Sequence, residues 1–451
     1  MKQRNDFVKR LLALVLPIAF QQFMLAVVSA SDAVMLGAFS QDSMSAVSLA
    51  GQVQFVFNLF LAAMTIGTSM LAAQYWGKGN KTAVEHIFAF VVRLSFPVSL
   101  AVTLCAAVFP SVLMRLLTPE TVLITFGAQY LRAVSLSYLL CGISQIYLCI
   151  MKNSGRVFLS SAISSVCVLM NILLNAIFIF GLFGMPVLGI KGAAIATVIA
   201  RAVELLWGML ASIGKDKIKL RIRMLLHPEK QIVRDFWKYT TPVLGNELVW
   251  GIGFTMGTVI MGHLGKDAVA ANSIANIAKN LAVCFCMGLG SGAGIMVGNE
   301  LGAGNLDTAR LYGKKLCRTA VISGVVTGGV LLCVSPFICH FAHLTQTATE
   351  YLKWMLVVCS VNLVGKSVNI ATISGIFCAG GDSKFGFLCD TITLWCIIVP
   401  LGLLAAFVFE LPVLTVYIII NLDELLKLLP VWKHYKRYKW VKDLTRKEKT
   451  Q

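Results

Sequence analysis

Charged residues are scarce in this chain. Asp, Glu, Lys and Arg together make up 13% of the 451 residues, whereas a soluble globular domain carries about 25%. Hydrophobic residues account for 57%, and the mean hydropathy is +0.79. This composition predicts an integral membrane protein and argues against a soluble domain.

Several patterns that would indicate other functions are also missing. No stretch shows the alternation of apolar and polar residues that is typical of a membrane β-barrel strand. There is no ATP-binding P-loop and no HExxH motif, and the 13 cysteines lack zinc or redox spacing. No small-residue cleavage site follows the first apolar run, so a cleaved signal peptide is not expected. We therefore expect no metal site, no organic cofactor and no enzyme activity.

Long apolar runs are abundant instead. A membrane-spanning helix needs about 20 predominantly apolar residues. Twelve runs meet this requirement: 11–36, 47–75, 87–114, 124–150, 158–183, 189–213, 240–262, 269–300, 315–341, 349–377, 385–409 and 411–430. The predicted fold is an all-α polytopic membrane protein with twelve transmembrane helices.

The net charge of +18 is distributed between these runs and at both ends of the chain. Lys and Arg are concentrated before the first span, in residues 215–238 and in residues 433–449, whereas residues 38–45 contain none. Under the positive-inside rule, this alternation places both termini and the central linker in the cytoplasm. We expect a multi-pass protein of the bacterial cytoplasmic membrane that contacts the lipid bilayer and does not bind nucleic acid.

The chain contains an internal repeat at an offset of 225 positions (242 − 17). Pro17 matches Pro242, and the ungapped register also pairs these residues: Gly37 with Gly262, Asp42 with Asp267, Gly67 with Gly292, Gly77 with Gly302, Gly79 with Gly304 and Asn80 with Asn305. Such a register indicates a duplicated half-length unit. Six spans separate the copies, and an even number preserves orientation, so a pseudo-two-fold axis along the membrane normal is expected.

This repeat predicts four regions. They are an N-terminal six-helix lobe (1–213), a basic cytoplasmic linker (214–238), a C-terminal six-helix lobe (239–430) and a basic cytoplasmic tail (431–451). For the linker, a basic surface helix and a solvated tether are equally compatible with the sequence.

Several short motifs occur in a fixed order along the chain. They are Asp32, 77–80, 171–175, 180–186, 192–197, Pro242, Asn246, Glu247, Trp250, 302–305, 380–382 and Asp390. Their order and spacing resemble the multidrug and toxic compound extrusion (MATE) family, and most closely its DinF-like branch. The resemblance covers nearly the whole chain.

The resemblance implies two six-helix lobes around a central cavity, and export of amphipathic, often cationic compounds in exchange for H⁺ or Na⁺. In some members a polar pocket joins a first-helix Asp to an Asn, an Asp and a Thr. The matching positions here are Asp32, Asn171, Asn175 and Thr197. Asn175 stands where those members have an acid, so this pocket contains one carboxylate.

Ionisable residues inside the spans are the candidates for ion coupling. Asp32 lies in an apolar run, where a carboxylate is costly and therefore functional by default. A position near the membrane interface is the alternative. Glu247, Lys366 and Asp390 lie in three spans of the second half, and mutual pairing would lower their cost. Coupling and a static ion pair are both compatible with this group.

Further residues are candidates for supporting or lining a transport site. Polar support is expected from Asn171, Asn175, Thr197 and Asn246, and the substrate-cavity candidates are Gln21, Gln22, Met35, Phe60, Met64 and Trp250. Methionines can form adaptable binding walls, but core or lipid-facing packing is the ordinary alternative for each.

The favoured function is a secondary active multidrug efflux antiporter that works by alternating access, with H⁺ or Na⁺ as the coupling ion. Its expected partners are small amphipathic molecules, and a monomer is expected. One alternative is a flippase for a lipid-linked precursor, which would need a strongly basic cavity. An intramembrane enzyme is the alternative from a different class, and the motifs it requires are absent.

Overall fold

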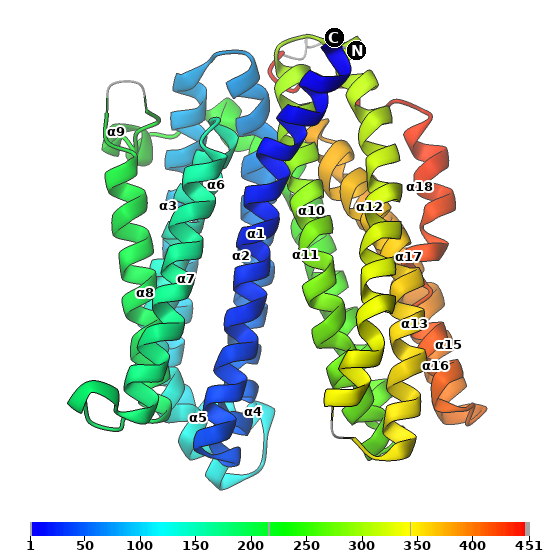
Figure 1. Ribbon diagram of the computed structural model, residues 1–451. Helices are drawn as coiled ribbons and strands as arrows, with labels where there is room; N and C mark the ends of the chain where they lie inside the picture. The colour runs from blue at the N-terminus through cyan, green and yellow to red at the C-terminus, as the bar shows by residue number, and fades with distance from the viewer. Residues whose placement is uncertain (1, 215–216, 343, 447–451) are drawn as a thin grey trace. The chain divides into compact units, whose positions relative to one another are not determined.

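The computed structural model describes residues 2–214, 217–342 and 344–446, and all regular elements in these ranges are helical (Figure 1). Residues 215–216 of the predicted linker and 447–451 of the predicted tail lie outside the described residues. The α-helices are α1 (Lys2–Phe39), α2 (Gln41–Gly77), α3 (Lys81–Val108), α4 (Pro110–Leu117), α5 (Thr121–Val134), α6 (Leu136–Asn153), α7 (Val157–Phe180), α8 (Ile190–Ala211), α9 (Ile222–Leu226), α10 (Lys230–Gly262), α11 (Lys266–Gly302), α12 (Leu306–Phe341), α13 (Gln346–Asn369), α14 (Ser383–Thr391), α15 (Val399–Leu403), α16 (Val413–Ile420), α17 (Asp423–Leu426) and α18 (Leu428–Tyr435). Between them lie a 3-10 turn, η1 (Leu182–Gly184), and three π-helical segments, η2 (Ile370–Phe377), η3 (Ile392–Ile398) and η4 (Leu404–Val408).

Among the described residues, ten helices are long and apolar enough to cross a membrane, and the pair α5 and α6, bent by 48°, makes an eleventh if it counts as one span. The polytopic all-α fold is thereby confirmed. The last predicted span, 411–430, differs from expectation, because it is divided among α16, α17 and α18. Asp423, Glu424 and Lys427 interrupt its apolar character and lie at this break.

The repeat is reproduced in the helix boundaries. Helices α2 and α11 both contain 37 residues, and their first and last residues differ by the same 225 positions (266 − 41 and 302 − 77). Each is followed by a glycine at matching positions, Gly79 with φ of 78° and Gly304 with φ of 80°. Glycine adopts this left-handed conformation without a Cβ clash, so it ends both helices in the same way.

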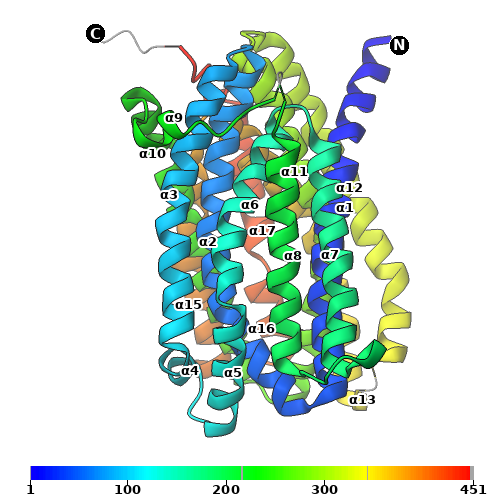
Figure 2. The same cartoon turned by 90° about the vertical axis from the view of Figure 1, so that its left-hand side faces the viewer.

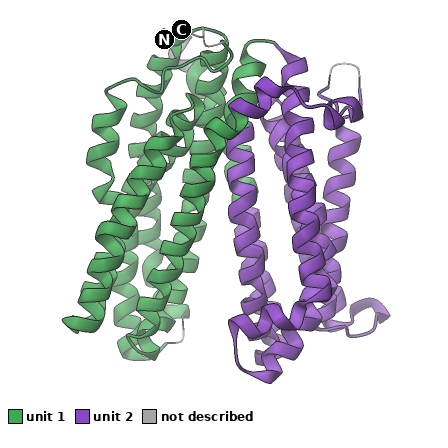
Figure 3. Ribbon diagram, turned by 180° about the vertical axis from the view of Figure 1, so that it is seen from behind, with its two compact units in different colours: residues 1–22, 69–79, 236–451 green, residues 23–68, 80–235 purple. Residues whose placement is uncertain are grey.

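The chain forms two compact units (Figure 3). Unit 1 contains residues 1–22, 69–79 and 236–451, and unit 2 contains residues 23–68 and 80–235. The start of α1 and the end of α2 therefore belong with the second half of the chain. Close backbone packing explains this for α2, since a Cβ on Gly77 would collide with the backbone of Asn299.

Unit 2 is a stack of helices in which α7 packs on α8, α8 on α6, and α6 on α3 (Figure 2). The described part of the linker returns along α3. The Lys219 amide donates to Oε1 of Glu85 at 3.2 Å, and Nε of Arg221 lies 2.7 Å from Oε2 of the same carboxylate. Nη1 of Arg93 also donates to the Leu226 carbonyl at 2.9 Å. The linker thus contains a short helix, α9, which is held against α3 by the Arg221–Glu85 ion pair and by hydrogen bonds to Glu85 and from Arg93.

In unit 1 the chain after α18 is anchored to the end of α2. Nε2 of Gln74 donates to the carbonyls of Ala379 (2.7 Å) and Lys442 (3.1 Å). Its Oε1 accepts from the Leu444 amide at 2.7 Å. Trp440 is completely buried in the adjacent hydrophobic core. Part of the predicted basic tail is therefore packed into the unit.

Candidate functional site

Unit 2 contains a polar group centred on Asp32 of α1. Nδ2 of Asn175 donates to Oδ1 of Asp32 at 2.5 Å, and the same nitrogen lies 3.3 Å from Oδ1 of Asn171. Nδ2 of Asn171 in turn donates to Oγ1 of Thr197 at 3.4 Å. The structure thus brings together the four residues that the resemblance grouped. We refer to these four residues as the Asp32 site.

Helix periodicity explains this arrangement. Asn171 and Asn175 are four residues apart on α7 and therefore lie on one face. Thr197, on the neighbouring α8, donates its own hydroxyl hydrogen to the Ala193 carbonyl at 3.0 Å and so presents a lone pair to Asn171. In this series of hydrogen bonds each donor has a defined acceptor, and the last acceptor is the Asp32 carboxylate.

The partners of Asp32 are electrically neutral. Within the described ranges, no Lys, Arg or His lies in an ion pair with Asp32. Oδ1 of Asn175 is buried and has no hydrogen-bond partner there. An amide can donate to a carboxylate and can accept from a carboxylic acid. The Asp32 site can therefore accommodate both the charged and the protonated form of its acid.

Glu204, a further buried acid of unit 2, is paired. Oε2 of Glu204 lies 2.7 Å from Nη1 of Arg201 and accepts a hydrogen bond from the Ser144 hydroxyl at 2.9 Å. Glu204 and Arg201 are three residues apart on α8, which places them on one helix face. This is a compensated structural pair, and it differs from Asp32 in having a permanent counter-charge.

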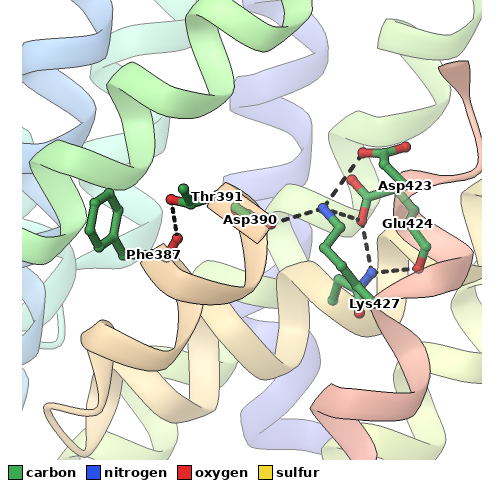
Figure 4. A network of polar contacts seen from close by, with 7 residues as sticks. Phe387, Asp390, Thr391, Asp423, Glu424 and Lys427 are labelled. Atoms are coloured by element: carbon green, nitrogen blue, oxygen red, sulfur yellow. Dashed lines mark hydrogen bonds and ion pairs between the residues drawn. The ribbon is translucent and has the colours of Figure 1, made fainter. Parts of the chain in front are cut away.

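Unit 1 contains a second polar group, the Lys427 cluster, which consists of Asp390, Asp423, Glu424 and Lys427 (Figure 4). Nζ of Lys427 lies 3.0 Å from Asp390, 3.3 Å from Glu424 and 3.6 Å from Asp423. The lysine is 3% exposed. Nδ2 of Asn369 donates a further hydrogen bond to Oε2 of Glu424 at 2.8 Å.

The cluster lies where three segments lose regular α-helical geometry. Asn369 immediately precedes the π-helical segment η2, and Asp390 lies two residues before η3. Asp423 and Glu424 begin α17, a helix of four residues that follows the break after α16. Their three- and four-residue spacing to Lys427 brings all three onto one face. Irregular turns of this kind are frequent at functional sites.

Within the described residues, Glu247, Lys366 and Asp390 form no direct ion pairs with one another. Asp390 pairs with Lys427 instead. Nζ of Lys366 lies 6.0 Å from the centre of the Trp250 ring, and neither Lys366 nor Glu247 forms an ion pair within the described residues. The reason is that the last predicted span supplies a lysine of its own, which reaches Asp390 directly.

Sequence reasoning missed Asp423, Glu424 and Lys427 as site candidates. An average over the strongly apolar run 411–430 concealed these three charges. A detectable signal was present, since Asp423 and Lys427 are four residues apart, the spacing of a helical ion pair.

The cavity candidates have varied surroundings. Met64 is completely buried, whereas Met35 and Phe60 are partly buried against hydrophobic clusters of unit 2. In unit 1, Trp250 stacks on Phe254 with ring centres 5.7 Å apart. The remaining candidates also lie in unit 1: Gln21 is buried, Nε2 of Gln22 lies 3.8 Å from the Met287 sulfur, and Asn246 is partly buried with its Oδ1 unpaired among the described residues. Their contribution to a substrate cavity stays a prediction.

Comparison with known proteins identifies relatives of this chain. Two relatives resemble almost the whole chain: the uncharacterized transporter YisQ of Bacillus subtilis is 21% identical over 98% of this chain and 97% of its own length, and the multidrug resistance protein MdtK of Yersinia enterocolitica is 24% identical over 88% and 87%. The probable multidrug resistance protein NorM of Thermotoga maritima is 25% identical over 66% of this chain and 64% of its own length.

Solved structures share the fold. A MOP superfamily transporter from Pyrococcus furiosus superimposes with a TM-score of 0.86 at 17% identity, covering 97% of both chains. The MATE transporter VcmN of Vibrio cholerae has a TM-score of 0.85 at 18% identity, covering 97% of this chain and 98% of its own. The MatE family model matches twice, over residues 17–177 and 242–404, and the two matches start at the repeated prolines. The chain therefore belongs to the MatE family of multi-pass membrane transporters.

Proposed function

We propose that this protein is a secondary active exporter that moves small amphipathic molecules out of the cytoplasm in exchange for H⁺ or Na⁺. The observation that carries the proposal is the bond between Asn175 and Asp32, which holds a carboxylate inside a membrane span among neutral partners. Relatives named as multidrug resistance proteins support the same substrate class.

A lone carboxylate can bind and release a cation without stranding a counter-charge. Cation binding at Asp32 removes a charge from the membrane interior, so the charged and neutral forms favour different helix packings. A cation entering down the membrane potential supplies about 2.3 kcal/mol per charge per 100 mV. Alternating exposure of a substrate site to the two sides of the membrane would convert this energy into uphill export.

The coupling test uses purified protein in proteoliposomes, with a pH gradient or a Na⁺ gradient supplied alone. We expect the Asp32→Asn variant to fold and to lose uphill export under whichever gradient drives the wild type. Glu120→Gln, an exposed acid of the same unit, is the control and should transport normally. Uphill export at the wild-type rate by Asp32→Asn would overturn the proposal and direct attention to Glu247.

The direction of export depends on membrane orientation. The concentration of Lys and Arg in the linker supports a cytoplasmic location for residues 217–238 and for both termini. In a cysteine-free background, an impermeant thiol reagent added outside intact cells should label Ser40→Cys and should not label Lys217→Cys. Labelling of Lys217→Cys and not of Ser40→Cys would show that the topology is the opposite of the one proposed.

A further inference from the structure

Unit 2 contains a pocket of about 350 Å³ between α4 and α5. These two helices lie at the end of the unit opposite to α9 (Figure 2). Among the described residues that line the pocket, none is acidic and six are polar: Ser111 and Arg115 from α4, and Thr121, Thr125, Gln129 and Arg132 from α5. The lining therefore carries two positive charges and no negative one.

Helical spacing explains why these polar side chains share one pocket. Ser111 and Arg115 are four residues apart on α4 and lie on one face. On α5, Thr121, Thr125 and Gln129 follow one another at the same interval, so they also lie on one face. Each helix thus presents one polar face to the pocket.

Apolar packing on the other sides of the two helices fixes this arrangement. Met114 and Leu131 are completely buried in a hydrophobic cluster with Ala50 of α2. A Cβ on Gly127 would collide with the Met114 side chain, so glycine allows α4 and α5 to approach closely. The pocket is therefore bounded by two helices that are held together by a common core.

The two arginines are exposed and have no counter-charge. Within the described residues, neither guanidinium group forms a hydrogen bond or an ion pair. The acids nearest in these elements, Glu120 before α5 and Asp42 at the start of α2, form no ion pair with them in the same ranges. Arginine binds phosphate oxygens through parallel N–H donors. Two unpaired guanidinium groups in one pocket therefore suit a phosphate group.

Neutral hydrogen-bond donors accompany the arginines. In the part of the chain that the structure describes, the side chains of Ser111, Thr121 and Gln129 donate no hydrogen bond. The Thr125 hydroxyl, in contrast, donates to the Thr121 carbonyl at 2.9 Å. Hydroxyl and amide donors beside two guanidinium groups can satisfy several oxygens of one phosphate group.

Large apolar side chains border the pocket along the chain. Leu116 is 79% exposed, and Val112 and Val122 are more than half exposed. Exposed apolar surface of this kind on a membrane protein contacts acyl chains. A phosphate-binding pocket beside such a surface matches the two chemical parts of a phospholipid.

The position of the arginines supports the same ligand. The proposed topology places the linker and α9 in the cytoplasm, so the pocket at the opposite end of unit 2 is on the outer side. The positive-inside rule disfavours Lys and Arg there, so membrane orientation does not explain the two arginines. Attraction of an anionic lipid headgroup does explain them.

We propose that this pocket binds the phosphate group of an anionic phospholipid in the outer leaflet, with the acyl chains against the exposed leucine and valines. A soluble phosphate ester offers the same oxyanion, and the apolar border favours the lipid. A zwitterionic lipid also carries an ammonium group, which the two arginines would repel. Only the choice of leaflet rests on the proposed topology.

Lipid titration tests the proposal. Full-length protein in dodecyl maltoside micelles is titrated with dioctanoyl phosphatidylglycerol or dioctanoyl phosphatidylcholine, and native mass spectrometry resolves the bound lipids. We expect the first phosphatidylglycerol to bind roughly tenfold more tightly than phosphatidylcholine. The double variant Arg115→Gln, Arg132→Gln should lose this difference. Equal binding of the two lipids to the wild type would overturn the proposal.

A matched variant separates a built pocket from general surface charge. Lys191→Gln removes an exposed lysine at the start of α8, away from the linker, and should bind phosphatidylglycerol like the wild type. An equal loss of affinity in Lys191→Gln and in the double variant would contradict the pocket. If the double variant does not fold, Arg115→Gln and Arg132→Gln are measured singly, and wild-type affinity in both would also contradict it.

A headgroup without acyl chains identifies the source of the phosphate. Glycerol 1-phosphate, titrated calorimetrically, should bind roughly tenfold more weakly than dioctanoyl phosphatidylglycerol, because it lacks the apolar contacts. Equally tight binding would overturn the assignment to a lipid. Asp32→Asn should bind phosphatidylglycerol normally, since Asp32 does not line the pocket. Failure of the lipid site therefore appears in micelles without any gradient, whereas failure of coupling appears in uphill transport.

Discussion

The Asp32 site of unit 2 and the Lys427 cluster of unit 1 both hold carboxylates in apolar segments, but they compensate the charge differently. Asp32 receives one hydrogen bond from a neutral amide. In the Lys427 cluster, three carboxylates surround one ammonium group. A group whose partners are neutral can change its charge alone, whereas loss of one charge from a buried network leaves the others uncompensated. This contrast supports the proposal that the Asp32 site binds the coupling ion reversibly, and we infer that the Lys427 cluster anchors its helices.

The largest expected effect tests the anchoring half of this contrast. Lys427→Met removes the single positive charge that contacts three buried carboxylates, and should lower the free energy of unfolding by about 3–5 kcal/mol. The measurement is denaturant or thermal unfolding in detergent. Lys433→Met, on the exposed side of α18, is the control and should change stability little. Wild-type stability of Lys427→Met would mean that the cluster does not anchor these helices.

The next effect tests the partner of Asp32. Asn175→Ala removes a hydrogen bond to a charged group, which contributes about 1.5–3 kcal/mol. At about 1.4 kcal/mol per decade, the apparent affinity for the driving ion should change by roughly 10- to 100-fold. With a proton drive, transport should reach half its maximal rate at a correspondingly lower proton concentration, because the charged carboxylate is less well stabilised. Asn58→Ala, at an exposed position of α2, should leave this profile unchanged.

A smaller effect is expected when one acid of the cluster is neutralised. Asp390→Asn keeps an acceptor for Lys427 and leaves two carboxylates in contact, so the loss of stability should be about 1 kcal/mol. In a double-mutant cycle, Lys427→Met and Asp390→Leu should couple by about 0.5–3 kcal/mol. Simple additivity of the two changes would show that the 3.0 Å contact has no energetic role.

The smallest effect on stability is expected at Asp32 itself. Asp32→Asn replaces a carboxylate with an amide of the same shape among neutral partners. The free energy of unfolding should therefore change by no more than about 0.5 kcal/mol. The same unfolding assay as for Lys427→Met gives the comparison directly. A loss of several kcal/mol would mean that Asp32 is an anchoring group like the cluster, and the contrast between the two sites would fail.

Sequence patterns predicted the features that depend on neighbours along the chain. The run of apolar spans follows from hydropathy, and the repeat from the prolines and glycines at an offset of 225. The position of Asn171 and Asn175 on one helix face follows from helical periodicity. Their association with Asp32 and Thr197 was implied by the resemblance, because no local pattern specifies which helices meet.

The pairing of the second-half charges was not predictable in this way. Lys366 and Lys427 both lie in apolar stretches of the sequence, and no sequence pattern indicates which of the two pairs with Asp390. The contact at 3.0 Å goes to Lys427, which lies 37 residues further along the chain. Hydropathy averages treated 411–430 as one more uniform span, and that averaging concealed the charges that break it.

The sequence by itself determined that this chain would fold as a duplicated set of membrane helices with a carboxylate in the first, because hydropathy, helix-ending glycines and periodicity act over a few neighbouring residues. Tertiary structure alone decided which charges are compensated. It also placed residues 1–22 and 69–79 in the same compact unit as the second half. Both outcomes depend on helix breaks and on close packing between segments that are far apart in the chain. The energy of a buried charge depends on which partner this packing brings within about 4 Å.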